Sequence, residues 1–189
     1  MSAKPLANLT EDISPVNCFS LNVLVVYEDA GARARVEKVY ESLTGQFSKD
    51  FCFGSTWCGF QELKDPLVAL ETARAAAEAD LILFSASARI EPPTMLKAWV
   101  ESWIARKQGR DGALGGLLNR TGADDGKTIP IQAYLTEVAR RTGMDSIFEI
   151  ISSPENTSAD AADNGMENII PLHHRLWNEA GPLSEFWPD

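Results

Sequence analysis

The chain has 189 residues, of which 44% are apolar and 23% are charged, and its formal net charge at pH 7 is −10. This apolar content excludes a wholly disordered chain, and the length fits one domain with tails better than two domains. The negative charge makes nucleic acid a poor partner, because binding phosphates requires neutralising cations, and we interpret it as a surface that favours solubility.

Neither a membrane segment nor a secretory signal is expected. No stretch reaches the roughly 18 apolar residues of a membrane span, and residues 1–8 contain one lysine and no apolar block. Three cysteines, Cys18, Cys52 and Cys58, cannot all pair within the chain, which favours a reducing compartment. We therefore expect a cytoplasmic protein whose cysteines are small buried apolar residues.

The first predicted strand covers residues 22–27, a nearly continuous apolar run of the kind that a buried parallel strand requires. A helix over residues 31–45 follows, with apolar side chains at helical spacing and an end at a glycine. A short second strand is predicted at 50–53, and residues 54–64 are interpreted as a packed loop.

The next helix begins cleanly at Asp65 and Pro66, an N-cap carboxylate followed by proline at the first helical position. It continues to about residue 79 through an alanine-rich stretch of high helix propensity. Its predicted apolar side consists of Leu67, Leu70, Ala73 and Ala77. The run LILF at residues 81–84 is the second strong strand, followed by a loop over 85–91.

Two prolines, Pro92 and Pro93, open a third helix. Its predicted inner face consists of Leu96, Trp99, Val100, Trp103 and Ile104. The apolar run at residues 113–118 contains two glycines and is the weakest of the predicted strands. The remaining predicted elements are a loop at 119–127, a helix at 130–143 and a last strand at 146–151.

Strands and helices therefore alternate through the chain, which predicts an α/β fold with a parallel sheet and helices on both faces. Five strands in this rhythm are typical of a three-layer flavodoxin-like domain with strand order 2-1-3-4-5. We expect this domain to span residues 21–152. An irregular N-terminal arm (1–20) would precede it, and a C-terminal extension (153–189) would follow, wrapping the domain or mediating self-association.

Residues 79–103, ADLILFSASARIEPPTMLKAWVESW, carry a family resemblance. This segment resembles the third strand and following helix of flavodoxin-like NAD(P)H-dependent FMN and quinone reductases. The residues that match the spacing of that family are Pro93, Leu96, Lys97, Glu101 and Trp103. The resemblance implies the fold, and with it an FMN site at the carboxyl ends of the strands.

The loop after the first strand departs from that family. Members usually hold the FMN phosphate with hydroxyl- or glycine-rich residues at a helix N-terminus, whereas residues 28–33 here read EDAGAR, without a hydroxyl. Two carboxylates would repel a phosphate, and only Arg33 or Arg35 could offset them. FMN is therefore considered but not favoured. The candidate cleft residues for a cofactor are Gly31, Arg33, Ser85, Ser87, Arg89 and Asn119.

The motif LVVYED at residues 24–29 also resembles the first strand of response-regulator receiver domains, where acidic residues hold Mg²⁺. The phosphoacceptor aspartate expected at the end of the third strand is replaced near Phe84 and Ser85, and no lysine follows the fifth strand. A degenerate receiver-like signalling domain, without phosphorylation, stays open as an alternative.

Other reactive side chains favour structural roles. Ser85 and Ser87 lack a nucleophile elbow and are expected to cap the next turn. Cys58 has no activating base nearby in sequence, and its spacing from Cys52 is too wide for a zinc pair, so no metal site is expected. A structural role is also preferred for the adjacent histidines at 173–174.

Three functions follow from these observations. The favoured one is a cofactor-free binding or regulatory scaffold, and the alternatives are an FMN-dependent NAD(P)H oxidoreductase and the receiver-like module. The expected partner is a protein or a small molecule. Trp99 and Trp103 could stack on a flavin ring, but their helical spacing favours core packing or a dimer face. We accordingly expect a homodimer formed through residues 92–108 or the C-terminal extension.

Overall fold

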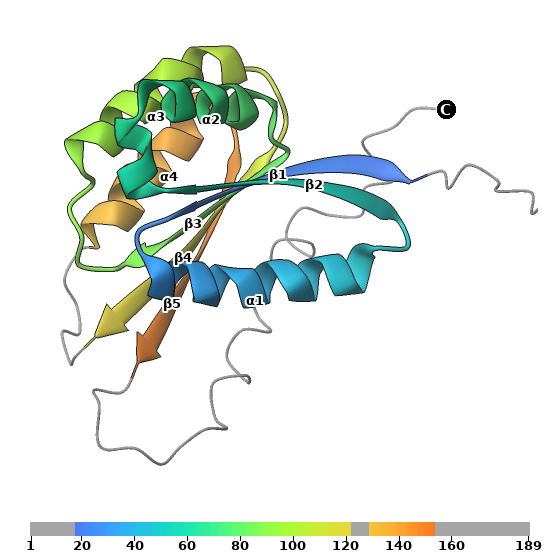
Figure 1. The fold of residues 1–189 in the computed structure, drawn as a ribbon, viewed down its shortest axis with the longest axis horizontal. Coiled ribbons are helices and arrows are strands. Elements are labelled where there is room, and N and C mark those ends of the chain that lie inside the picture. The colour runs from blue at the N-terminus through green and yellow to red at the C-terminus, as the bar shows by residue number, and fades with distance from the viewer. Residues whose placement is uncertain (1–17, 122–128, 154–189) are drawn as a thin grey trace, which may run out of the picture.

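A computed structural model describes residues 18–121 and 129–153, which form one five-stranded sheet with helices on both faces (Figure 1). All strand pairs are parallel, and their order is β2-β1-β3-β4-β5. The α/β class and the flavodoxin-like strand order expected from the sequence are thus confirmed. No helix in the described ranges is long and apolar enough to cross a membrane.

Every strand is longer than its apolar run predicts. The strands are β1 (Phe19–Tyr27), β2 (Phe51–Gly59), β3 (Leu81–Ser87), β4 (Ala113–Thr121) and β5 (Asp145–Ser153). The apolar runs mark only part of each strand, and the remaining residues still complete the hydrogen-bond ladder. The packed loop predicted at 54–64 is therefore wrong in its first half, where β2 continues to Gly59. A 3-10 turn, η1 (Phe60–Lys64), follows.

Sequence signals place the helices more closely than the strands. The helices are α1 (Ala30–Phe47), α2 (Pro66–Glu78), α3 (Thr94–Lys107) and α4 (Pro130–Thr142). The Asp65 carboxylate accepts a hydrogen bond from the Leu67 N–H at 2.8 Å, as an N-cap should. Gly143 ends α4 in the left-handed conformation, with φ of 77°. The predicted end of α1 at Gly45 is wrong, because that helix continues to Phe47.

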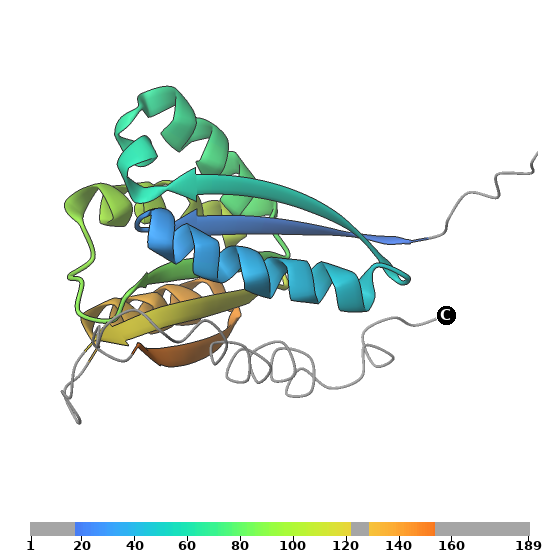
Figure 2. The same ribbon diagram turned by 60° about the horizontal axis from the view of Figure 1, so that its bottom comes forward.

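The two faces of the sheet are covered unequally (Figures 1 and 2). Helices α2, α3 and α4 pack on one face and build the larger core cluster, while α1 is the only described helix on the other. Trp99 and Trp103 are 3% and 0% exposed, with ring centroids 5.6 Å apart. These tryptophans belong to the core of the domain and do not form a free helix face.

The predicted apolar side of α2 is rotated from the true one. Leu67 is 71% exposed and Leu70 is 45% exposed, whereas the buried residues of the helix are Thr72, Ala73, Ala76 and Ala77. Small side chains face inward because α2 packs beside α3, whose tryptophans occupy the space. The exposed leucines therefore correct the prediction that they face the core.

The weakest predicted strand lies inside the sheet, between β3 and β5. A methyl group added at Gly116 would lie 2.3 Å from Cδ1 of Phe148, and one at Gly115 would lie 2.7 Å from Cδ2 of Leu83. The glycines of β4 thus leave room for large side chains of the neighbouring strands, a requirement that strand propensity alone does not show.

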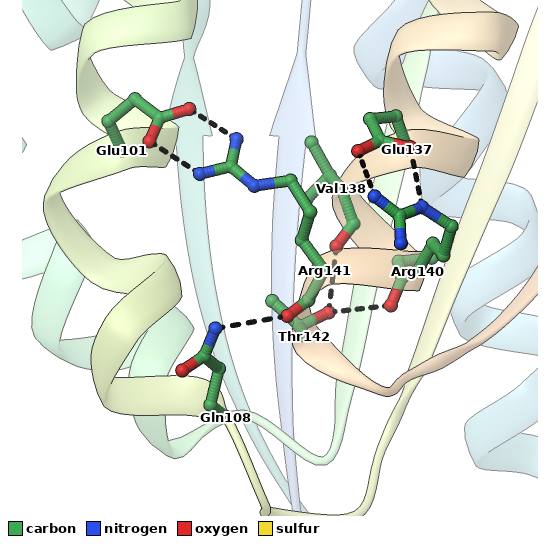
Figure 3. A network of polar contacts seen from close by, with 8 residues as sticks. Glu101, Gln108, Glu137, Val138, Arg140, Arg141 and Thr142 are labelled. Atoms are coloured by element: carbon green, nitrogen blue, oxygen red, sulfur yellow. Dashed lines mark hydrogen bonds and ion pairs between the residues drawn. The ribbon is translucent and has the colours of Figure 1, made fainter.

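A polar network on the surface joins α3 to α4 (Figure 3). Arg141 donates two hydrogen bonds to the Glu101 carboxylate, at 2.5 and 2.7 Å. The amide of Gln108 donates to the Arg141 carbonyl at 3.3 Å. The Arg141 guanidinium holds the pKa of Glu101 below its ordinary value, by hydrogen bonding first and by charge second.

At its amino end the sheet narrows to two strands. The first three residues of β1, Phe19–Leu21, pair only with residues 51–53 of β2, because Asn22 already forms two hydrogen bonds with Asp80, directly before β3. We call these two segments, residues 19–21 and 51–53, the amino-terminal overhang. A disulfide between Cys18 and Cys52, with Cα atoms 5.5 Å apart, closes it.

The disulfide corrects the sequence-based interpretation of the cysteines. Cys18 is half-buried and Cys52 is exposed, so neither is a buried apolar residue. Only Cys58 is fully buried and carries a free thiol. Because Cys18 and Cys52 form a disulfide, the odd number of cysteines no longer favours a reducing compartment.

Candidate functional site

The carboxyl ends of β1 and β3 define the candidate site. Ligands of open parallel sheets bind beyond these ends, where the strand order reverses, and here the chain reverses between β1 and β3. The loop after β1 contains Glu28 and Asp29, and the loop after β3 runs from Ala88 to Pro93. The loop after β4 begins beyond Thr121, outside the described residues.

Glu28 connects the two strand ends. Its backbone N–H donates to the Ser85 carbonyl at 2.9 Å, continuing the ladder between the strands. Its side-chain Oε2 accepts a hydrogen bond of 2.6 Å from the backbone N–H of Ser87. The carboxylate of Glu28 therefore occupies a backbone donor at the end of β3. Charge-assisted hydrogen bonds of this kind are stronger than hydrogen bonds between neutral groups.

Asp29 caps helix α1. Its Oδ1 accepts a hydrogen bond from the Ala32 N–H at 2.7 Å, and its carbonyl accepts one from the Arg33 N–H at 2.9 Å. A carboxylate in this position satisfies an otherwise unpaired N–H and interacts favourably with the positive end of the helix dipole. The Asp29 carboxylate thus occupies the first turn of α1, the position at which an external anion would bind.

The same pattern continues along the edge to β2. The Glu62 carboxylate accepts a hydrogen bond from the Gly59 N–H, where β2 ends and η1 begins. Together with Asp65 at the start of α2, four carboxylates beyond the carboxyl ends of β1 and β2 are bound to backbone N–H groups. These acidic side chains complete the loop structure, which leaves fewer backbone donors for an external anion.

The two serines of the predicted cleft have structural hydrogen bonds. Ser85 is completely buried, and its hydroxyl donates to the Ala32 carbonyl at 2.8 Å, which attaches the first turn of α1 to β3. The Ser87 hydroxyl accepts a longer bond of 3.4 Å from the Arg89 N–H in the turn that follows β3. Neither contact resembles a nucleophile held by a general base.

Arg33 lies against aromatic rings at the ends of β1 and β2. Its guanidinium carbon lies 5.6 Å from the ring centroid of Tyr27 and 6.0 Å from that of Trp57, within the range of cation–π interactions. Tyr40 meets Trp57 edge to face at 5.5 Å. The sequence analysis identified Arg33 but missed Tyr27 and Trp57, because their proximity depends on the register of β1 and β2.

The other candidate residues are partly brought together. The Asn119 carbonyl accepts a hydrogen bond from the Ala88 N–H at 2.8 Å, which places the end of β4 beside the loop after β3. Arg89 is exposed in that loop. A methyl group at Gly31 would lie 3.3 Å from Oδ1 of Asp29. Ser85, Ser87 and Asn119 thus lie at the adjoining carboxyl ends of β3 and β4, and Gly31 lies beside the cap of α1, while Arg33 lies against the rings of Tyr27 and Trp57.

These residues do not fit a flavin phosphate. A phosphate at this position would take the first N–H groups of α1 and the hydroxyls of the adjoining loop. Here the Asp29 carboxylate takes the Ala32 N–H, the Glu28 carboxylate takes the Ser87 N–H, and the Ser85 hydroxyl is directed to a carbonyl. A dianion would meet two fixed carboxylates, and the cation beside this turn is the Arg35 guanidinium, whose Nη1 would lie 3.4 Å from a methyl group at Gly31.

Cys58 is buried near the carboxyl end of β2, and its thiol has low reactivity. Burial is the main cause that raises its pKa to about 11, and the nearby charge of Glu62 adds to the effect, while a hydrogen bond with Thr72 opposes it. A thiol in this state forms little of the reactive thiolate. In the described ranges, no group of three His, Cys, Asp or Glu residues could hold a metal ion. His173 and His174 lie outside those ranges.

Solved structures share this fold at low sequence identity. An oxidoreductase from Corynebacterium diphtheriae matches with a TM-score of 0.53 and 13% identity over 87% of this chain and 96% of that one. A short-chain flavodoxin associated with a bacterial microcompartment matches with a TM-score of 0.51 and 11% identity, over 82% and 93%. The chain therefore has the flavodoxin-like fold.

At these identities the likeness concerns the fold, and fold alone does not define an activity. The sequence matches no protein-family model. The curated proteins contain no significant match either. The function must therefore be argued from the site.

Proposed function

We propose that this protein is a flavodoxin-like binding or regulatory scaffold that works without a bound flavin. One observation carries the proposal: the Asp29 carboxylate occupies the Ala32 N–H in the first turn of α1, where a phosphate would bind, and the Glu28 carboxylate is fixed on the Ser87 N–H at the end of β3. Displacing Asp29 would leave two negative charges next to the incoming phosphate. Of the two arginines that could offset these charges, Arg33 lies against Tyr27 and Trp57, and the Arg35 guanidinium lies near Gly31.

An absorption spectrum of the purified protein, before and after incubation with FMN and desalting, tests this proposal. We expect a colourless protein that retains no FMN. A double variant, Glu28→Gln with Asp29→Ser, removes both charges and should increase FMN retention. The matched control, Glu37→Gln with Glu41→Gln, removes two exposed charges from α1 and should leave retention unchanged. Retained flavin in the unaltered protein would overturn the proposal in favour of the oxidoreductase alternative.

The receiver-like alternative predicts a partner protein and no redox activity. The acidic residues that would hold Mg²⁺ in a receiver are Glu28 and Asp29, and both are occupied by backbone donors. Titration with Mg²⁺, followed by NMR of the amides of Ala32 and Ser87, distinguishes the two. Specific shifts of these amides would favour the receiver-like module over the scaffold.

The partner of the scaffold is proposed to be a protein or a small molecule, and its location is proposed to be cytoplasmic. Self-association through residues 92–108 also stays a proposal, although the buried tryptophans of α3 are not available to it. Light scattering after size-exclusion chromatography tests it directly. A strict monomer at micromolar concentration would exclude the homodimer.

A further inference from the structure

We propose that the Cys18–Cys52 disulfide is a reversible redox clasp. Thiol–disulfide exchange would open and close it in the folded protein, and its state would determine whether the start of β1 is covalently attached to β2. This proposal is independent of the flavin question, because the clasp lies at the amino ends of the strands and the candidate site at their carboxyl ends (Figure 1).

The overhang that the disulfide closes is weakly supported in other ways. Residues 19–21 have one neighbouring strand, and an isolated two-stranded ribbon is at best marginally stable. Aromatic contacts support one face of the overhang: Phe19 with Phe51, Phe51 with Phe53, and Phe53 with Tyr40 of α1, at centroid distances of 6.2, 6.3 and 6.4 Å.

The described side chains on the other face of the overhang are exposed. Side chains alternate between the faces of a strand, and the residues at the alternate positions, Ser20 and Cys52, are both exposed. Cys52 therefore presents its sulfur on this exposed face, and Cys18 is half-buried. Exchange requires that a thiolate reach one of the two sulfur atoms, and this position provides that access.

Opening the bond would leave the core intact. Neither Cys18 nor Cys52 belongs to the two core clusters of the described residues. The following part of β1, Val23 to Val26, is buried between β2 and β3. The third cysteine, Cys58, is buried and its raised pKa keeps it protonated, so it does not compete in exchange. Cys18 and Cys52 thus form a pair that is either joined by a disulfide or reduced to two thiols.

The exchange needs a dithiol reductant. One thiolate of the dithiol attacks Sγ of Cys52, forms a mixed disulfide and releases the Cys18 thiolate, which takes up a proton. The second thiolate of the dithiol then attacks the mixed disulfide and releases Cys52, which is also protonated. Two electrons and two protons pass to the protein, and the dithiol becomes a disulfide. The reverse sequence closes the clasp.

The full-length protein is tested with reduced dithiothreitol under native conditions. Maleimide labelling and mass spectrometry then count the accessible thiols, and hydrogen exchange follows the backbone. We expect labelling of Cys18 and Cys52 but not of Cys58. Exchange should become at least about tenfold faster in residues 19–21 and 51–53, while NMR shows native amide chemical shifts in Val23–Val26. Subsequent oxidised dithiothreitol should restore both readouts.

Three results would overturn the clasp. The bond could resist reduction until the protein is denatured, its reduction could abolish the native amide chemical shifts of Val23–Val26, or the purified protein could contain no such bond even after treatment with oxidised dithiothreitol. A Cys58→Ala variant serves as the control, since it should behave as the unaltered protein does. A Cys52→Ser variant should show the fast exchange of the overhang without any reductant.

Discussion

The two ends of β1 are fastened in opposite ways. At the carboxyl end, the carboxylates of Glu28 and Asp29 bind the backbone of β3 and α1, so three elements meet through short charge-assisted bonds. At the amino end, β1 has only β2 beside it, and a covalent bond between Cys18 and Cys52 joins them. At the carboxyl end of β1 the contacts are hydrogen bonds from backbone N–H groups to the carboxylates of Glu28 and Asp29. At the amino end the contact is a disulfide, which a reductant can break.

This difference teaches where a scaffold of this fold can respond to its surroundings. A site whose donors are already satisfied gains little from a new anion, because each new bond replaces an existing one. An overhang with one neighbouring strand has low local stability, so a single bond has a large local effect. The following predictions test the two ends, from the largest expected effect to the smallest.

Cys18→Ser should lower the free energy of unfolding by about 3–4 kcal/mol, because it releases a cross-link that spans 34 residues and so restricts the unfolded chain. Urea unfolding without reductant measures the change. The unaltered protein in excess reductant should lose the same amount, and the variant should lose nothing more. A change below about 0.5 kcal/mol would mean that the amino end does not depend on the bond.

Lys107→Met should cost about 2–3 kcal/mol. The Lys107 side chain is 1% exposed, and its Nζ donates to the carbonyls of Ala79 and Asp111 in the loops at the amino ends of β3 and β4. Methionine keeps the length of the stem but leaves both carbonyls without this donor. Arg106→Met, at the neighbouring exposed position, is the control and should change the unfolding energy little. If the two variants lowered the free energy of unfolding equally, the buried hydrogen bonds of Lys107 would not stabilise the amino ends of β3 and β4.

Glu28→Ala should cost about 1.5–2 kcal/mol, since the Ser87 N–H loses a charged acceptor. Glu28→Gln keeps an acceptor of similar length without the charge and should recover part of the loss. Chemical denaturation compares the two variants, and hydrogen exchange at Ser87 reports the bond itself. Unchanged protection of the Ser87 amide in Glu28→Ala would show that the bond does not close the carboxyl end in solution.

Asp29→Ala should cost about 1 kcal/mol, the usual loss for an N-cap. Asp29→Asn preserves an acceptor for the Ala32 N–H and should be nearly neutral, because asparagine caps helices about as well. Both are measured by denaturation at low ionic strength. A loss in Asp29→Asn as large as in Asp29→Ala would mean that charge, and not capping, stabilises this end.

The smallest effect is expected at the exposed pair of Glu101 and Arg141, away from both ends of β1 (Figure 3). In Arg141→Gln the pKa of Glu101 should rise toward its ordinary value. A lowered carboxyl pKa contributes stability above the pKa of the unfolded chain, which is lost as the pH falls through the folded value. NMR titration of Glu101 follows this, and added salt should diminish the difference. An unchanged pKa would show that the pair does not form.

Sequence patterns located most of the fold but only part of the site. Pro66 and Gly143 marked helix ends correctly, since capping is a property of adjacent residues. The buried side of α2 was misplaced at Leu67 and Leu70, because the position of α3 determines which side faces inward. At the candidate site, Gly31, Ser85, Ser87 and Asn119 are predicted from the strand ends and their role stays a prediction, whereas the hydrogen bond of Glu28 with the Ser87 N–H is not predicted.

The sequence by itself determined the alternation of strands and helices, because apolar periodicity and helix caps are local properties. That alternation predicts the parallel sheet, and the strand order was expected from the flavodoxin-like pattern that the alternation resembles. Only the tertiary structure decided that residues 54–59 form a strand, that Cys18 pairs with Cys52, and that Glu28 binds an N–H group 59 residues away. These contacts depend on register between segments distant in the chain, which no local pattern specifies.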